Sequence, residues 1–209
     1  SGNYPLFNRA IQAAYPPGST LKPFLALAGL EYGAIGSGSV FPHSCTGEFR
    51  FGSRLFGCWN KEGHGSLALR EAMTRSCDVY FYQLGLRLGL GRLSGFMSRL
   101  KLSEKTGIDL PQERRGLFPD ENWYDRRFGT GRWSRGVTLN LAIGQGEVSL
   151  TPVKLAQLTA LIANGGTLWT PHLISGVSTE GHRLPTGPPD SLHNVMPIER
   201  RYIAIVRDA

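Results

Sequence analysis

The clearest hydrophobic pattern near the start of the chain runs through residues 20–32. Pro23 fits a helix only in its first turn, where a missing N–H is tolerated. The helix therefore begins near Ser19, and Ser19 and Lys22 share one face because they are three residues apart. Apolar side chains recur at the spacing of one helix face, which predicts this helix: Leu21, Phe24, Leu25, Ala28 and Leu30.

Other helical patterns follow along the chain. The strongest spans 151–163, because Thr151 can cap the helix, Pro152 suits its first position, and Asn164–Gly165 can end it. Weaker patterns predict helices at 66–73 with Ser66 as the cap, at 79–90, at 91–100 and from Pro197 onward.

Three stretches lack a helical period. Residues 41–65 are rich in glycine and aromatic residues, which predicts a small β-hairpin near 45–58 within an irregular loop. Residues 103–136 are rich in Gly, Pro, Arg and Trp, and residues 175–195 are polar and rich in proline, so both predict long loops. The expected structure is mainly helical.

Composition and charge narrow the classes of partner. Hydrophobic residues make up 41% and charged residues 19% of the 209 residues, which is typical of a globular core. Lysine and arginine (23) exceed aspartate and glutamate (16), and the formal net charge of +7 favours an anionic partner. No nucleic-acid motif accompanies this charge, so nucleic acid is not an expected partner. No segment reaches the roughly 18 apolar residues of a membrane span.

The stretch "YPPGSTLKPF" contains the first candidate chemistry. A serine hydroxyl is a weak nucleophile at neutral pH and needs a nearby base, which a lysine one helical turn away can supply. The start of a helix also favours a developing oxyanion and offers a backbone N–H to hold it. The alternative is a capping Ser19 with a solvated Lys22, but the turn-forming "PPG" before Ser19 favours catalysis.

A second polar element lies in "RSCDVYFYQLG", at a break between two predicted helices. Ser76 and Asp78 flank a small residue there and could reach into a cleft as part of a proton relay. The alternative is an ordinary helix cap, in which either side chain binds free backbone N–H groups.

The cysteines pose a separate question. Cys45, Cys58 and Cys77 are the three cysteines of the chain, and His64 lies between the last two. Thiolates and an imidazole suit tetrahedral Zn²⁺, although the spacing is not that of a standard zinc finger. A Cys45–Cys58 disulfide with Cys77 free, or three unrelated thiols, are the alternatives. His43 is a further candidate ligand.

Several blocks in order resemble the transpeptidase domain of a class B penicillin-binding protein, and within it the elongation-specific subtype called penicillin-binding protein 2. The similarity covers about residues 4–175. It implies the penicillin-recognising α+β fold of serine transpeptidases and β-lactamases, of which residues 1–209 would be a truncated, mostly helical portion with a small hairpin. The blocks are "NRAIQAAYPPGSTLKPFLALAGLEYG", "GHGSLALREAMTRSCDVYFYQLG", "GLGRLSGFMSRL", "KTGIDLPQE" and "LNLAIGQGEVSLTPVKLAQLTALIANGGTLWTPHL".

The resemblance implies a role for each candidate residue. Ser19 would attack the penultimate D-alanine carbonyl of a peptidoglycan stem peptide, and Lys22 would take its proton. Ser76 would relay a proton to the leaving D-alanine. Asp78 stands where most of these enzymes have asparagine, and the elongation subtype commonly carries this aspartate. β-Lactams would acylate Ser19 as substrate mimics.

The resemblance also bears on the metal, the partners and the location. Some elongation-type members bind structural zinc in this region, which favours Zn²⁺ at Cys45, Cys58, His64 and Cys77. The partners would be stem peptides ending in D-Ala-D-Ala, β-lactam antibiotics and a membrane glycosyltransferase of the elongation machinery. The parent protein would be anchored in the bacterial inner membrane, with this domain in the periplasm. No cofactor is needed for acyl transfer.

The family's third motif, Lys-Thr-Gly, has a misleading counterpart at residues 105–107. In the family this motif follows the Ser-x-Asn/Asp element by well over a hundred residues, whereas this one comes soon after Asp78 and continues into a loop sequence. By that order the true motif would lie beyond Ala209, and the chain would lack the sheet strands that flank it. A β-lactam sensor, a β-lactamase or a non-catalytic scaffold are the competing functions.

Overall fold

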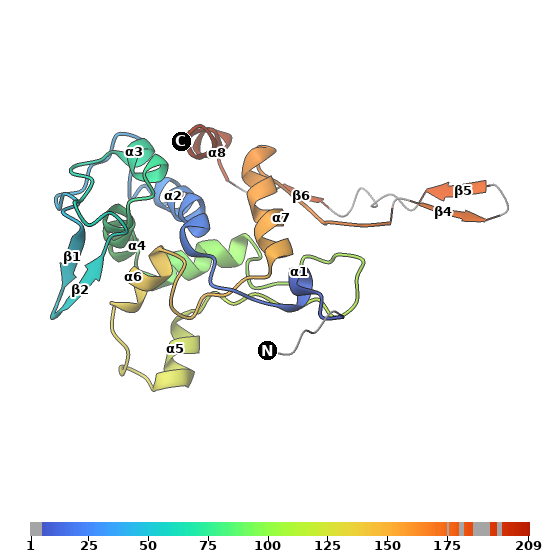
Figure 1. Cartoon of the computed structure of the whole chain (residues 1–209), viewed down its shortest axis with the longest axis horizontal. Helices are drawn as coiled ribbons and strands as arrows, with labels where there is room; N and C mark the ends of the chain where they lie inside the picture. The colour runs from blue at the N-terminus through green and yellow to red at the C-terminus, as the bar shows by residue number, and fades with distance from the viewer. Residues whose placement is uncertain (1–5, 175, 180–181, 186–192, 196–197) are drawn as a thin grey trace.

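The structure is a computed structural model that describes residues 6–174, 176–179, 182–185, 193–195 and 198–209. It is mainly helical, with short strands at its edges (Figure 1). The helices are α1 (Arg9–Gln12), the 3-10 turn η1 (Gly18–Leu21), α2 (Lys22–Glu31), α3 (Leu69–Thr74), α4 (Asp78–Arg99), α5 (Glu121–Phe128), α6 (Val137–Ala142), α7 (Pro152–Ala163) and α8 (Arg200–Arg207). The strands are β1 (Glu48–Phe51), β2 (Arg54–Gly57), β3 (Thr167–Trp169), β4 (Gly176–Thr179), β5 (His182–Pro185) and β6 (His193–Val195).

The strands form antiparallel pairs, β1 with β2, β3 with β6 and β4 with β5. The β1–β2 pair is the predicted hairpin, in which Glu48 lies opposite Gly57 and Phe51 opposite Arg54. The hydroxyl of Tyr82 donates a 2.9 Å hydrogen bond to Gly57 O and so fastens this hairpin to α4. The helix-rich α+β architecture agrees with the sequence prediction.

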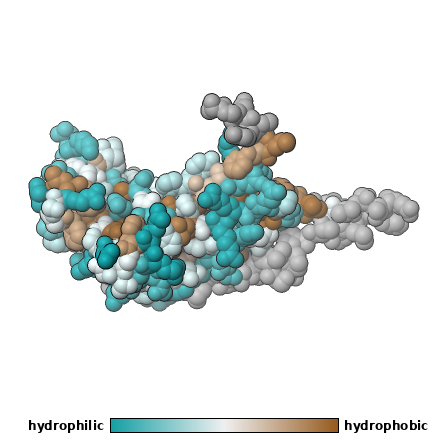
Figure 2. All heavy atoms as spheres, turned by 90° about the horizontal axis from the view of Figure 1, so that it is seen from below, coloured by the Kyte–Doolittle hydropathy of each residue, from teal (hydrophilic) through white to brown (hydrophobic). Residues whose placement is uncertain are grey.

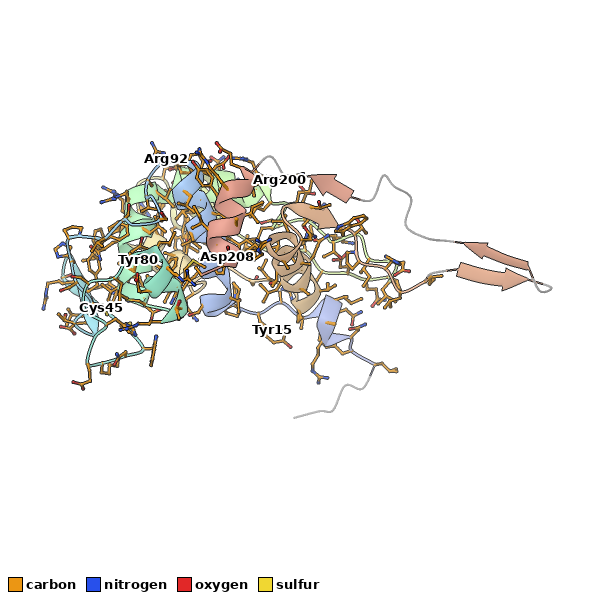
Figure 3. The ribbon with its side chains drawn as sticks, turned by 90° about the horizontal axis from the view of Figure 1, so that it is seen from above. Tyr15, Cys45, Tyr80, Arg92, Arg200 and Asp208 are labelled. Carbon is orange, nitrogen blue, oxygen red and sulfur yellow. The ribbon has the colours of Figure 1, made fainter. Side chains whose placement is uncertain are left out.

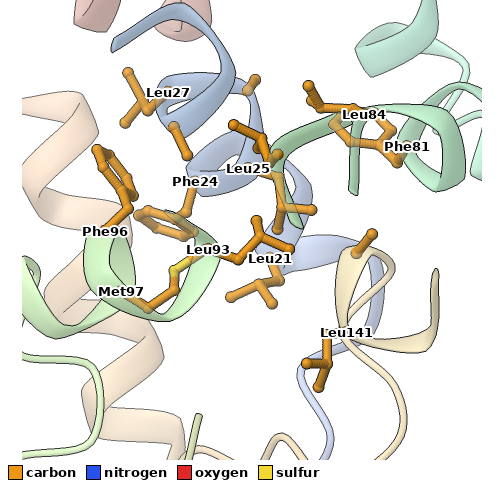
Figure 4. Packing of buried hydrophobic residues seen from close by; sticks show 14 of the residues in the cluster. Leu21, Phe24, Leu25, Leu27, Phe81, Leu84, Leu93, Phe96, Met97 and Leu141 are labelled. Atoms are coloured by element: carbon orange, nitrogen blue, oxygen red, sulfur yellow. The ribbon is translucent and has the colours of Figure 1, made fainter. Parts of the chain in front are cut away.

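The core lies where α2 crosses α4, with α6 against α4 and α8 against α2. Figure 4 shows Phe24 and Leu25 of α2 beside Leu93 and Met97 of α4, and all four side chains are buried. Fully burying one such side chain stabilises the fold by roughly 1.5–3 kcal/mol, so this contact fixes the position of α2. On the face seen in Figure 2, hydrophilic and hydrophobic residues are interspersed.

The helix that carries the first candidate residues forms as predicted. The 3-10 turn η1 holds Ser19, and α2 continues from Lys22 with Pro23 in its first turn. Helix α7 is also confirmed, because the side chain of Thr151 accepts a 3.2 Å hydrogen bond from the N–H of Lys154 and Pro152 is its first residue. Long α4 bends at Gly89, whose φ of 74° breaks the helix close to the predicted boundary.

Four predictions of local structure were wrong or incomplete. Residues 103–136 contain helix α5, because the side chain of Asp120 caps it by accepting a 2.6 Å hydrogen bond from Trp123 N. Helix α3 begins after Ala68, whose N–H donates to Glu71 Oε2 at 3.1 Å, so Ser66 is not its cap. The segment 175–195, predicted as a loop, contains strands β4, β5 and β6 in its described part.

The fourth concerns the last helix. Helix α8 begins at Arg200, after Glu199, and not at Pro197, which lies outside the described residues. Among the described residues, no helix is both long and apolar enough to cross a membrane.

Buried Lys154 gives the fold a pH dependence that can be measured. This residue is 1% exposed, and its Nζ donates to Gln157 Oε1 at 2.8 Å. Burial lowers the pKa of Lys154 to about 8, although Glu113 and Glu104 oppose the shift. Between this pKa and the ordinary lysine pKa of about 10.4, the unfolded chain holds a proton that the folded chain has released, so the unfolding free energy rises with pH.

We therefore expect the unfolding free energy of the unaltered chain, relative to Lys154→Met, to rise by roughly 2–3 kcal/mol between about pH 7.5 and about pH 10.5. Urea unfolding of both proteins at the two pH values measures this difference. Lys105→Met is the control, because the side chain of Lys105 is exposed. Parallel pH curves for Lys154→Met and the unaltered chain would contradict the prediction.

Candidate active site

Ser19 lies exposed in the turn that opens α2, and a second turn holds it in place. The N–H of Gly18 donates to Gly144 O at 2.9 Å, which joins the "PPGS" segment to the "AIGQG" turn. A Cβ atom on Gly144 would lie 2.1 Å from Gly18 O, so a side chain at this position would displace the segment. The "AIGQG" turn therefore packs by its backbone beside Ser19.

Lys22 is the centre of the site. Its side chain is almost fully buried, and its Nζ donates to Asp78 Oδ1 at 2.6 Å and to Ser76 Oγ at 3.0 Å. A third hydrogen bond of 2.7 Å reaches the backbone oxygen of Ser76. The fold thus brings the Ser-x-x-Lys and Ser-x-Asp elements together across more than fifty residues of sequence.

Ser76 occupies a strained turn between α3 and α4. Its φ of 50° places it in the left-handed region, which is uncommon for a residue other than glycine. The neighbouring N–H groups hold this turn, because Ser76 N donates to Met73 O and Cys77 N donates to Ala72 O, both at 2.9 Å. The conformation directs both the hydroxyl and the backbone oxygen of Ser76 toward Lys22. Strain of this kind concentrates at functional sites.

Asp78 opens α4 but does not act as a simple cap. The residue before it, Cys77, is the N-cap and makes no capping hydrogen bond with its side chain. The two carboxylate oxygens of Asp78 have different partners, since Oδ1 accepts from Lys22 and Oδ2 accepts from Trp59 N at 3.1 Å. The capping alternative from the sequence is therefore wrong for Asp78.

The three cysteines and His64 form a compact cluster beside this site. Their ligand atoms all lie within 4.8 Å of one another, and His64 Nδ1 is 3.5 Å from both Cys45 Sγ and Cys58 Sγ. Figure 3 shows Cys45 at the end of the molecule opposite β4 and β5, beside Tyr80 of α4. All three cysteines are free thiols, so the Cys45–Cys58 disulfide is not formed, and they are not unrelated in space. The side chain of His43 packs on Phe49 and lies outside the cluster.

The protonation of Cys77 and His64 bears on metal binding at the cluster. Burial raises the pKa of the Cys77 thiol to about 12, with smaller contributions from Cys45 and Cys58. Burial and the positive charge of Arg75 lower the pKa of His64, which keeps its imidazole neutral and able to bind a metal. His64 Nε2 is buried and has no hydrogen-bond partner within the described chain. Once ionised, three cysteine thiolates together with one neutral imidazole are a donor set that Zn²⁺ prefers, so binding of the ion would displace the thiol protons.

The Lys-Thr-Gly sequence at 105–107 belongs to a structural loop. The hydroxyl and the N–H of Thr106 both donate to Glu113 Oε1 at 2.6 Å, and the N–H of Gly107 donates to Glu113 Oε2 at 3.1 Å. Glu113 is buried, so these hydrogen bonds compensate the desolvation of its carboxylate. Both hydrogen-bond donors of Thr106 are therefore engaged in stabilising this loop.

Sequence reasoning did not identify Trp59 as part of this site. Its N–H binds Asp78, and its indole Nε1 donates to Arg75 O at 3.0 Å. One signal in the sequence could have indicated it. Trp59 directly follows Cys58, and if Cys58 and Cys77 belong to one cluster, Trp59 must lie near the turn that carries Cys77.

Comparisons with known proteins agree with this geometry. The family model described as the penicillin-binding protein transpeptidase domain matches residues 1–208. The peptidoglycan D,D-transpeptidase MrdA of Acinetobacter baumannii is 40% identical over 172 residues, which cover 81% of this chain and 25% of that protein. MrdA of Escherichia coli K12 is 34% identical over 183 residues, covering 88% of this chain and 29% of its own length. The chain thus spans between a quarter and a third of these relatives.

Solved structures give the same result for the fold. Pseudomonas aeruginosa PBP2, solved in complex with WCK 5153, has a TM-score of 0.81 and 37% identity, over 96% of this chain and 44% of its own. Helicobacter pylori PBP2, solved in complex with MreC, has a TM-score of 0.79 and 35% identity, over 97% of this chain and 36% of its own. The chain therefore belongs to the penicillin-binding protein transpeptidase family and is of the penicillin-binding protein 2 type.

Proposed function

We propose that this chain carries the acylating centre of a peptidoglycan D,D-transpeptidase that cross-links stem peptides during cell-wall elongation. The observation that carries the proposal is the set of hydrogen bonds at Lys22. A buried lysine, one helical turn from Ser19, contacts both Ser76 Oγ and Asp78 Oδ1. A structural lysine needs only a counterion, whereas this one also reaches a hydroxyl that can pass on a proton.

The proposed reaction gives each of these residues one step. Lys22 accepts the proton of Ser19 Oγ while that oxygen attacks the carbonyl carbon of the penultimate D-alanine. The backbone N–H of Ser19 and the start of the helix stabilise the oxyanion. The C–N bond then breaks as Ser76 passes its hydroxyl proton to the departing D-alanine amine and takes a proton from Lys22, and the acyl group remains on Ser19. The amine of a second stem peptide attacks this ester, forms the cross-link and restores the Ser19 hydroxyl.

The alternatives predict different lifetimes of the acyl group. A β-lactamase needs a residue that activates a deacylating water, and the sequence offers no candidate for it. A β-lactam sensor would form a persistent adduct but would not cross-link peptides. A scaffold would form no adduct. The names of the relatives favour the transpeptidase.

We also propose that Cys45, Cys58, His64 and Cys77 bind one structural Zn²⁺. Four protein ligands leave no open position for a reacting water, so the ion would supply stability and not chemistry. The convergence of the four ligand atoms within 4.8 Å and the neutral imidazole support this assignment. In this role the ion would hold the 41–65 segment against the turn that carries Ser76.

Further proposals concern the parent protein. Residues 1–209 would be part of one transpeptidase domain, with the third catalytic motif and the flanking strands supplied by sequence outside this range. The partners would be stem peptides ending in D-Ala-D-Ala, β-lactams and a membrane glycosyltransferase. Two similar structures support this class of partner, because one is PBP2 in complex with MreC and the other belongs to a peptidoglycan synthase complex that coordinates polymerization and crosslinking. The periplasmic face of the inner membrane is the corresponding location.

Intact-mass spectrometry after incubation with a penicillin tests the function. We expect a covalent adduct of one penicillin per chain that maps to Ser19 and persists for many minutes. Ser19→Ala should form none, whereas Ser37→Ala, which removes an exposed hydroxyl, should retain it. An adduct on another residue, or none on the folded chain and on a version extended beyond Ala209, would refute the proposal.

A further inference from the structure

Trp59 lies between the cysteine–histidine cluster and the site around Lys22, and it contacts both. It directly follows Cys58, and its ring packs edge-on against His64 with 5.2 Å between ring centroids. Its indole Nε1 donates to Arg75 O, and its backbone N–H donates to Asp78 Oδ2. One residue therefore holds both ends of the segment Arg75–Asp78, which contains strained Ser76.

Trp59 is 63% exposed, although it is a large apolar residue. Burial of the ring is therefore not the main contribution of this residue, and an exposed tryptophan gains little hydrophobic stabilisation. Its two hydrogen bonds are directional and both end on the segment that contacts Lys22. A residue with an exposed ring and two directional hydrogen bonds is expected to fix the positions of the residues that it binds.

The position of Asp78 depends on both of its partners. With Lys22 on Oδ1 at 2.6 Å and Trp59 N on Oδ2 at 3.1 Å, the plane of the carboxylate is fixed. If the indole contact with Arg75 O is lost, the segment Arg75–Asp78 can shift away from Trp59 and the Oδ2 contact weakens with it. The carboxylate can then rotate, and Lys22 Nζ follows the oxygen to which it is bonded. The 3.0 Å contact between Lys22 Nζ and Ser76 Oγ then lengthens. Small displacements of a base from its partners slow a reaction strongly.

We propose that Trp59 is a positioning residue for acyl transfer, which holds Ser76 and Asp78 in place around Lys22. The inference rests on the proposed transpeptidase function. Trp59 acts through its neighbours, so its loss should slow the covalent step without weakening the initial binding of a β-lactam.

The test replaces Trp59 with 3-benzothienylalanine, in which sulfur takes the place of the indole N–H while the ring keeps its shape. The same replacement at Trp133, whose Nε1 donates to Asp125 Oδ1 at 2.7 Å, is the matched control. Stopped-flow acylation by a fluorescent penicillin gives the first-order acylation rate constant and the preceding dissociation constant separately. We expect the rate constant to fall roughly 10-fold at Trp59, with the dissociation constant unchanged, and neither to change at Trp133.

Trp59→Pro, which also removes the backbone N–H, should slow acylation further, and its thermal midpoint shows whether it still folds. If Trp59 served only to keep the chain folded, its replacement would reduce the fraction of chains that become acylated. The acylation rate constant of the chains that still fold would not change. An unchanged rate constant would overturn the inference, and so would a change confined to the dissociation constant, which would instead indicate contact with the ligand. If the unaltered chain forms no adduct at Ser19, the proposed function itself is refuted, and this inference with it.

Discussion

Lys22→Met is expected to slow the acylation of Ser19 by a penicillin by about 10³-fold, because it removes the proposed base for the serine proton. The substitution keeps most of the apolar stem of Lys22, which packs within the core, and loses only the terminal amine. It also leaves the carboxylate of Asp78 without its 2.6 Å partner. The rate of adduct formation, followed by intact mass over hours, measures the effect.

A second substitution at the same position separates catalysis from folding. Lys22→Arg retains a positive charge opposite Asp78, but arginine cannot give up its proton in a protein and so cannot act as a base. We expect a thermal midpoint close to that of the unaltered chain together with loss of acylation. Lys61→Met, at an exposed lysine, should change neither property. Acylation of Lys22→Arg within 10-fold of the unaltered rate would show that the base is another group.

The part of the site that lies within one helix could be predicted from sequence. Ser19 and Lys22 are three residues apart, so the helical period alone places them on one face, and the structure confirms the helix. Thr151 and Pro152 likewise mark the start of α7 through local chemistry. Helix α5 was missed because its surroundings are rich in glycine and arginine, although Asp120 is a recognisable cap.

The contacts between distant elements could not be predicted in this way. The positive φ of Ser76 has no signature in the sequence, since most residues with such a φ are glycine or asparagine. The contact of Trp59 N with Asp78 involves a backbone group, which every residue except proline possesses. The convergence of three cysteines and His64 depends on how the hairpin folds over α4. The resemblance to a family indicated these four residues as candidate metal ligands, and the structure shows that their side chains lie close together.

Removal of zinc is the second change with a large expected effect. We expect the unaltered chain to hold one zinc ion in native mass spectrometry, and a strong chelator to lower its thermal midpoint by more than about 10 °C. The physical reason is that the segment from Cys45 to His64 packs few apolar residues of its own, while the cluster joins it to α4 through Cys77. Without a cation, the buried Cys77 thiol stays protonated, because burial raises its pKa to about 12.

Single substitutions then identify the ligands. Cys58→Ser should lose the ion and lower the midpoint by a similar amount, because a neutral hydroxyl is a far weaker zinc ligand than a thiolate. His43→Ala is the matched control, since its ring packs on Phe49 and its hydrogen bonds to Gln83 come from the backbone. It should retain both the ion and the midpoint. A chain that is two hydrogens lighter and free of zinc would instead indicate a disulfide, and Cys58→Ser that still holds one ion would show that Cys58 is not a ligand.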